Sequence, residues 1–245
     1  MENINFGKNV HVHPTAIIYP NVILHDNVFI EPYCIIGQPT GDYYKNPENH
    51  EFKVTEIGAN SVIRSNTVIY ENVKVGENFQ TGHNVTIREE TIIGKNCSVG
   101  TLCDLQGKTV IGDFTRLHSN VHIGQFTRIG NYVWIFPYVV TTNDMYPPMD
   151  RLEGVTIEDY ALITTGSILL PGVVIGANSM VAAGSVVSKD VKQNMVVMGV
   201  PAREKCPITD IRDQDGEMVY PWPEHMKEYR GYPWQTEKEF SKKRQ

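Results

Sequence analysis

The sequence of 245 residues lacks the marks of several common protein classes. It has four cysteines and no CxxC pair, so nothing indicates a disulfide framework. Its net charge is −6, which argues against nucleic acid as a partner. The apolar stretch 161–175 is interrupted by Thr, Gly and Pro, so we expect no membrane span.

The amino terminus and the general composition also argue against a signal peptide and a separate catalytic domain. The first residues, MENINFGKNV, contain no apolar segment of the kind that signal peptides carry. No charge run or low-complexity stretch divides the chain, so a separate catalytic domain is not expected. These observations predict a cytoplasmic protein built around one domain.

A six-residue repeat is the dominant feature that is present. An aliphatic residue returns at every sixth position, and a small or β-branched residue follows four positions later. The repeat occurs 26 times, in three runs that extend from Phe6 to Ile36, from Ile57 to Ile135 and from Ile157 to Val187. Thr81 is the polar exception at the aliphatic position, and Phe79 is the bulky exception at the small position.

This period predicts an all-β fold, a parallel β-helix. Each repeat forms one short strand and one turn, and three repeats close a triangular coil. Residues 18 apart then stack at the usual inter-strand spacing of about 4.8 Å, and we expect about nine coils. The aliphatic and small positions point inward, so Cys34, Cys97 and Cys103 are predicted to fill the core.

Two insertions and a carboxy-terminal segment interrupt or end the repeat. Loops 38–56 and 141–156 must be extruded, because the repeat resumes in phase after each, and loops on a rigid scaffold often carry function. We assign the solenoid domain to residues 1–200 and a carboxy-terminal extension to 201–245. The aromatic residues Trp222, Tyr229, Tyr232 and Trp234 predict that this extension packs on the solenoid or on a neighbouring subunit, with a short helix near 223–230.

The repeat also carries a family resemblance over residues 5–203. Together with GANSMVAAGSVVSKDV and GVPAR, it resembles the left-handed β-helix acyltransferases, also called hexapeptide-repeat acyltransferases. The resemblance implies a homotrimer with sites between subunits, and acyl-CoA or acyl carrier protein as the donor. It also makes the predicted solenoid left-handed.

Local motifs narrow the implied acceptor. IGQPTGDYYKN and IGANSVIRSNTVI resemble the lipid A acyltransferases that use a nucleotide sugar. GHNVTIREETIIG and VVTTNDMYPP resemble the nucleotide-linked amino-sugar N-acetyltransferases, especially those acting on amino-deoxyhexoses. The resemblance therefore implies transfer of an acetyl group from acetyl-CoA to the amino group of a dTDP- or UDP-linked amino-deoxy sugar in bacterial surface-glycan biosynthesis.

One position departs from that family pattern. Many relatives carry a His-Asp pair in the stretch that reads HIGQFTRIG here, and this chain has Gln125 followed by Phe126. Either another histidine replaces the usual general base, or the substrate amine is deprotonated without a protein base.

Stacking points to one candidate for a replacement base. His122 occupies an outward position, and Asp104 lies 18 residues earlier, one coil away. A carboxylate beside an imidazole orients it and makes it more basic, so His122 and Asp104 are the predicted catalytic pair, acting either as the base or as the anchor of the amine. Val140 continues this column just before the second loop, so we expect Asn143 and Asp144 to converge on the pair.

The other predicted substrate contacts come from turns and loops. His83 and His118 lie in turns, next to the break at Thr81 and in place of a glycine respectively. Asn84 shares its turn position with many asparagines, which favours a structural role; only the family resemblance makes it a substrate contact. Loop residues complete the predicted set, which is His83, Asn84, His118, Asn143, Asp144, Tyr146 and Tyr44, with Tyr43 as an alternative to Tyr44.

The donor is predicted to lie on the later coils. Small residues taken to point outward would accept the pantetheine arm, and basic residues near the end of the solenoid would hold the anionic nucleotide of acetyl-CoA. The first group is Ala161, Thr164, Ala182 and Ala183, and the second is Lys189 and Arg203, with Lys192 and Lys205 nearby.

Three alternatives remain. An O-acyltransferase using acyl carrier protein would need a basic patch for that acidic carrier, and the sequence has none. A γ-class carbonic-anhydrase-like metal solenoid would use His83, His118 and His122, but His83 and His118 are 35 residues apart, not a multiple of 18. A non-catalytic scaffold is the third. The favoured interpretation requires no metal.

Overall fold

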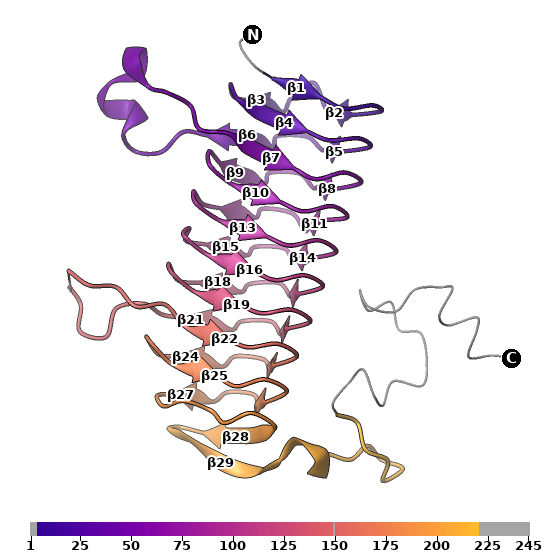
Figure 1. Ribbon diagram of the computed structural model, residues 1–245, viewed down its shortest axis with the longest axis vertical. Coiled ribbons are helices and arrows are strands. Elements are labelled where there is room, and N and C mark those ends of the chain that lie inside the picture. Colours follow the sequence, from indigo (N-terminus) through magenta and orange to yellow (C-terminus); the bar gives the residue numbers. More distant parts are fainter. Residues whose placement is uncertain (1–3, 149, 221–245) are drawn as a thin grey trace, which may run out of the picture.

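The computed structural model describes residues 4–148 and 150–220, and these form one continuous parallel β-helix (Figure 1). Three sheets run along its length, and we call them A, B and C.

Sheet A contains nine strands: β1 (Asn5–Phe6), β4 (Val22–Leu24), β7 (Thr55–Ile57), β10 (Lys74–Val75), β13 (Ile92–Ile93), β16 (Val110–Ile111), β19 (Arg128–Ile129), β22 (Thr156–Ile157) and β25 (Val174–Ile175). Sheet B contains eleven: β2 (His11–Val12), β5 (Phe29–Ile30), β8 (Val62–Ile63), β11 (Gln80–Thr81), β14 (Ser98–Val99), β17 (Arg116–Leu117), β20 (Trp134–Ile135), β23 (Leu162–Ile163), β26 (Met180–Val181), β28 (Met195–Gly199) and β29 (Ala202–Pro207). Sheet C contains nine: β3 (Ile17–Ile18), β6 (Ile35–Gln38), β9 (Val68–Tyr70), β12 (Thr86–Ile87), β15 (Asp104–Leu105), β18 (His122–Ile123), β21 (Val140–Thr141), β24 (Ile168–Leu169) and β27 (Val186–Val187).

The strand register follows the predicted stacking. Between the two loops each strand pairs in parallel with the strand 18 residues away, as Gln80 does with Ser98 and Asp104 does with His122. The backbone hydrogen bonds agree, since the Asp104 amide donates to the Val121 carbonyl at 3.0 Å. The predicted all-β parallel β-helix is therefore confirmed.

The core contains the residues that the repeat assigned to it. The aliphatic positions of the second and third runs are buried, and so are Cys34, Cys97 and Cys103. Burial raises the pKa of Cys97 to about 12, so this thiol stays protonated and acts as an apolar filler. Both exceptions also face inward: Phe79 is fully buried, and the Thr81 hydroxyl accepts a hydrogen bond from the Arg64 amide at 2.8 Å.

The corners of the prism use left-handed backbone. Asn60, Asn78 and Asn96 have φ values of 59°, 58° and 57°, and Asn84 belongs to the same series at 56°. Asparagine tolerates this conformation better than most residues, which explains its recurrence at one turn position. The backbone alone thus accounts for an asparagine at position 84.

Both loops leave the solenoid where the chain passes from sheet C to sheet A, and they project on the same side (Figure 1). The first lies between β6 and β7 and contains two short 3-10 helices, η1 (Tyr43–Lys45) and η2 (Pro47–Asn49). The second lies between β21 and β22.

The carboxy-terminal part closes one end of the solenoid. Strand β29 pairs antiparallel with β28, and the 3-10 helix η3 (Ile208–Asp210) follows. Tyr220 then packs against Trp134 and Leu162 on the outer face of sheet B. The predicted helix near 223–230 and the residues Trp222, Tyr229, Tyr232 and Trp234 lie outside the described residues. Within 4–148 and 150–220, no helix is long and apolar enough to cross a membrane.

Candidate functional site

Asp104 and His122 form a pair on the outer face of sheet C. Their positions on β15 and β18 are in register, and Nδ1 of His122 lies 3.2 Å from Oδ2 of Asp104. The side chains are 41% and 39% exposed, so the pair is accessible to a ligand. Stacking therefore predicted this contact correctly.

Gln106 supports the pair in a way that the sequence analysis did not anticipate. Its Nε2 donates a hydrogen bond to the same Oδ2 of Asp104 at 2.5 Å. The hydrogen bond from His122 lowers the pKa of Asp104 most, and Gln106 and the charge of Arg88 lower it further against a smaller opposing effect of burial. Asp104 is thus held as a carboxylate that accepts from Nδ1–H of His122, which leaves Nε2 as the basic nitrogen.

The second loop starts next to this pair. Val140 in β21 is the register partner of His122, so the chain enters the loop one coil beyond the histidine. Within the loop, the Asn143 carbonyl accepts from the Glu153 amide at 2.8 Å, and Oδ1 of Asp144 accepts from the Tyr146 amide at 3.2 Å. Tyr146 is 76% exposed. Convergence of Asn143 and Asp144 on the pair stays a prediction.

The first loop is fastened to the solenoid by Glu71, which is buried. Its Oε1 accepts from the amide and hydroxyl of Thr40, and its Oε2 accepts from the Lys53 amide at 3.0 Å and contacts Nε2 of His50 at 3.0 Å. Burial raises the pKa of Glu71, but the hydrogen bonds from Lys53, Thr40 and His50 outweigh it and the net shift is downward. The loop therefore closes around one buried carboxylate.

The predicted nucleotide contact lies at the tip of that loop. The Tyr44 hydroxyl accepts a hydrogen bond from Nε2 of Gln38 at 2.9 Å, and the side chain is 66% exposed. Tyr43 packs edge-on against Tyr44 and His50. Both tyrosines are thus ordered by neighbours, and their contact with a nucleotide stays a prediction.

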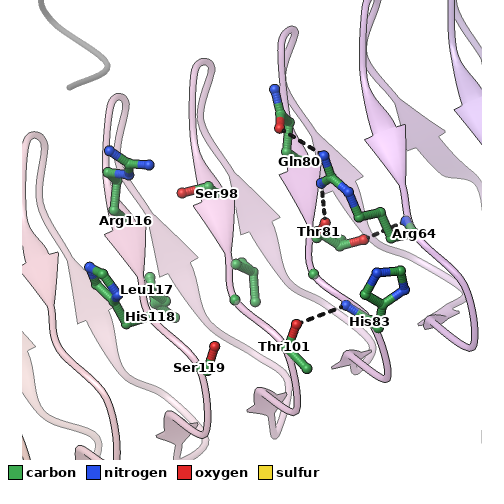
Figure 2. Close-up of a pocket in the computed structure, with 13 residues that line it drawn as sticks. Arg64, Gln80, Thr81, His83, Ser98, Thr101, Arg116, Leu117, His118 and Ser119 are labelled. Atoms are coloured by element: carbon green, nitrogen blue, oxygen red, sulfur yellow. Dashed lines mark hydrogen bonds between the residues drawn. The ribbon is translucent and has the colours of Figure 1, made fainter. Parts of the chain in front are cut away.

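A groove of about 370 Å³ lies on the outer face of sheet B and includes two predicted residues, His83 and His118 (Figure 2). It crosses strands β11, β14 and β17. Its lining consists of Arg64, Gln80, Thr81, Gly82, His83, Ser98, Val99, Gly100, Thr101, Arg116, Leu117, His118 and Ser119. The groove and the Asp104–His122 pair lie on adjacent faces, because the chain turns one corner between His118 and His122.

The two histidines of the groove have different surroundings. His83 Nδ1 is 2.7 Å from the Ser65 hydroxyl on the preceding coil. The His118 ring stacks with Trp134 and Phe136, and in the described part of the chain its buried Nε2 has no hydrogen-bond partner. Burial lowers the pKa of His118, and the charge of Arg116 lowers it further, so this ring is neutral at pH 7.

Of the residues predicted to bind acetyl-CoA, all but one lie at the surface. Thr164 and Ala182 are half-buried and Ala183 is exposed, so these three do reach the surface. Lys189 and Arg203 are exposed near the end of the solenoid. Ala161 is fully buried, so its predicted outward placement is wrong. Ala161 lies four residues after Ile157 and therefore occupies the inward small position of the repeat.

Metal ligation by the three histidines has no geometric support. Across residues 4–148 and 150–220, no group of three or more His, Cys, Asp or Glu side chains is placed to hold a metal ion. Within one chain, His83, His118 and His122 therefore do not form a three-histidine cluster.

Comparison with known proteins agrees with the β-helical fold. The family model described as "Bacterial transferase hexapeptide (six repeats)" matches residues 3–38 and 154–189. The fold is also that of a UDP-N-acetylglucosamine acyltransferase from Francisella novicida, with a TM-score of 0.69, 21% identity, and coverage of 81% of this chain and 71% of that one. The protein is thus a left-handed parallel β-helix. Its repeats are similar to those of the hexapeptide-repeat transferases.

Characterised relatives include both O- and N-acetyltransferases. A galactoside O-acetyltransferase from Lactococcus lactis is 35% identical over 131 residues, which are 48% of this chain and 63% of that protein. A 2,3,4,5-tetrahydropyridine-2,6-dicarboxylate N-acetyltransferase from Staphylococcus aureus is 33% identical over 90 residues, which are 37% of each chain. The chain thus spans less than two thirds of the length of these relatives.

Proposed function

We propose that the protein transfers an acetyl group from acetyl-CoA to the amino group of a dTDP- or UDP-linked amino-deoxy sugar. The Asp104–His122 contact at 3.2 Å is the observation that carries the proposal, because it supplies an oriented general base. The similarity to a galactoside O-acetyltransferase and to an N-acetyltransferase supports acetyl transfer as the class of reaction.

The pair performs one defined step in this reaction. The neutral amine attacks the thioester carbonyl, the new C–N bond forms, and the C–S bond breaks to release the CoA thiol. Nε2 of His122 accepts the proton that the amine loses, and Asp104 stabilises the resulting imidazolium. The proton then passes to the departing sulfur, so charge balances without another reactant.

The remaining residues are assigned to the two substrates. His83, His118 and Asn84 would contact the acceptor from the corner between sheets B and C, while Asn143, Asp144 and Tyr146 would contact it from the second loop and Tyr44 from the first. Thr164, Ala182 and Ala183 would lie along the pantetheine arm, and Lys189 and Arg203 would hold the nucleotide of acetyl-CoA. Ala161 is excluded from this set because it is buried.

A homotrimer with sites between subunits is part of the proposal, and the outer face of sheet C supports it. Its column contains six apolar residues and only three polar ones: Ile17, Ile35, Val68, Thr86, Asp104, His122, Val140, Ile168 and Val186. An apolar strip on an outer surface favours contact with another subunit. A second copy covering this strip would enclose the half-exposed pair in a cleft.

Thiol release from acetyl-CoA tests the proposal across a panel of nucleotide-linked amino sugars. We expect His122→Ala to reduce turnover by about 10²–10⁴-fold, the usual contribution of a positioned base. His25→Ala is the matched control, because His25 forms a similar exposed pair with Glu56 at 2.7 Å on another part of the surface. A loss below about tenfold in His122→Ala would overturn the assignment.

An O-acyltransferase acting on a nucleotide sugar, with acyl carrier protein as donor, is the second candidate. The similarity to galactoside O-acetyltransferase favours a hydroxyl acceptor. The same panel, extended with hydroxyl analogues and an acylated carrier protein, separates the two candidates. Turnover of the hydroxyl analogue alone would favour this second function.

A further inference from the structure

The groove on sheet B has a chemical character of its own. Two arginines, Arg64 and Arg116, and two histidines line it, and hydroxyl groups of Ser98, Thr101 and Ser119 lie between them (Figure 2). Among residues 4–148 and 150–220 the lining contains no carboxylate, although the chain carries a net charge of −6. Positive charge and hydroxyl donors are therefore concentrated at one place on an acidic protein.

The length of the groove comes from two glycines. Arg64, Gly82, Gly100 and His118 occupy the same position on four successive coils, as their spacing of 18 residues requires. A Cβ on Gly82 would collide with the backbone of Thr101, and one on Gly100 with the backbone of His118. The strip between Arg64 and His118 is thus free of side chains over about three coil spacings, roughly 14 Å.

Arg64 is fixed at one end of this strip. Its Nη1 donates to the Thr81 carbonyl at 2.6 Å, and its Nη2 is 3.4 Å from Oε1 of Gln80. These acceptors are neutral, and in the described ranges 4–148 and 150–220 the salt bridges do not include Arg64. The guanidinium is oriented, but its charge is not compensated by a carboxylate.

Arg116 is fixed at the other end. Its guanidinium lies 5.2 Å from the ring centre of Trp134, in a cation–π contact. Ser98 lies between the two arginines along the groove, one coil from Arg116. Guanidinium groups bind phosphate oxygens with paired hydrogen bonds, and hydroxyl groups provide further donors.

We propose that this groove binds the phosphate groups of an extended organic phosphate, with Arg64, Ser98 and Arg116 as the binding residues. Where the ligand is the nucleotide sugar, this inference rests on the proposed function and assigns its diphosphate to these residues. Coenzyme A carries the same phosphate chemistry and is the other source. The roughly 14 Å strip accommodates a diphosphate together with the groups attached to it.

Isothermal titration calorimetry of the full-length protein with inorganic pyrophosphate is the primary test. We expect Arg64→Gln and Arg116→Gln each to weaken binding by about 10–100-fold, the effect of losing hydrogen bonds to a charged group. Arg128→Gln is the matched control, because Arg128 is an exposed arginine on sheet A beside Glu158 and Asp159. Equal affinity in the wild type and the Arg64→Gln/Arg116→Gln double variant would overturn the proposal.

A second pair of variants leaves intact the hydrogen bonds that Arg64 makes with Thr81 and Gln80. Ser98→Glu places a carboxylate between the arginines, and Ser98→Gln adds a neutral side chain of the same size. We expect Ser98→Glu to weaken pyrophosphate binding at least about tenfold relative to Ser98→Gln. Equal affinities for these two variants, with unchanged melting temperatures, would contradict the assignment.

Titration with uridine or thymidine diphosphate and with CoA then identifies the source of the phosphate. Dependence of nucleoside diphosphate affinity on Arg64 and Arg116 assigns the groove to the acceptor, and dependence of CoA affinity assigns it to the donor. Both outcomes support a phosphate site, whereas arginine-independent binding of both ligands opposes it. Because these readouts need no turnover, failure of the proposed acetyl transfer would leave the binding result intact.

Discussion

Oδ2 of Asp104 accepts hydrogen bonds from two residues, Nδ1 of His122 at 3.2 Å and Nε2 of Gln106 at 2.5 Å. The imidazole is therefore oriented by a carboxylate that is itself oriented by an amide. This arrangement sets which nitrogen of His122 carries the proton, so a change at Asp104 should alter the tautomer of His122.

Asp104→Asn tests that property. The amide can donate to Nδ1 of His122, which favours the tautomer with the proton on Nε2 and removes the basic nitrogen. We expect turnover to fall by about 10²-fold or more with little change in the melting temperature. Glu56→Gln, the equivalent change in the His25–Glu56 pair, serves as control. Wild-type turnover in Asp104→Asn would show that the pair is not the base.

Glu71 provides a stability prediction with a defined pH dependence. Its side chain is 2% exposed and receives hydrogen bonds from both ends of the first loop. We expect Glu71→Gln to lower the free energy of unfolding by about 1–3 kcal/mol and to speed proteolysis within residues 38–56. Glu90→Gln, at an exposed corner one coil away, is the control.

The sign of the pH effect follows from the lowered pKa of Glu71. A carboxyl group whose pKa is lower in the folded state stabilises the protein fully above its unfolded pKa of about 4.3. That stability is lost as the pH falls through the lower folded value. Melting curves from pH 6 downward should therefore show the wild type losing stability and converging on Glu71→Gln. Parallel curves would contradict the assignment.

The repeat determined which contacts could be predicted from sequence. The Asp104–His122 contact depends only on backbone register, which the spacing of 18 fixes. The contacts of Gln106 and Arg64 depend on side-chain conformations, so periodicity could not predict them. The sequence did contain a signal for the groove, because Gly82 and Gly100 lie between Arg64 and His118 in one column. Ala161 was misplaced although the repeat itself assigns that position to the core.

Replacing each of two alanines by leucine tests the corrected placement of Ala161. Ala161 is fully buried and Ala183 is exposed. We expect Ala161→Leu to overpack the core and lower the free energy of unfolding by about 1–3 kcal/mol, measured by denaturant titration. Ala183→Leu should leave stability within about 0.5 kcal/mol and raise KM for acetyl-CoA, as its proposed place beside the pantetheine arm requires. An unchanged KM would remove Ala183 from the donor site.

The outer face of sheet C gives the last prediction. Ile168 belongs to its apolar column and is 37% exposed, whereas Ile92 is 52% exposed on sheet A. A lysine within a subunit contact would bury an unpaired charge, so we expect Ile168→Lys to prevent formation of the proposed homotrimer and to abolish turnover together with assembly. Ile92→Lys should affect neither. Light scattering during size-exclusion chromatography measures the mass, and dissociation by Ile92→Lys rather than Ile168→Lys would place the contact on sheet A, away from the Asp104–His122 pair.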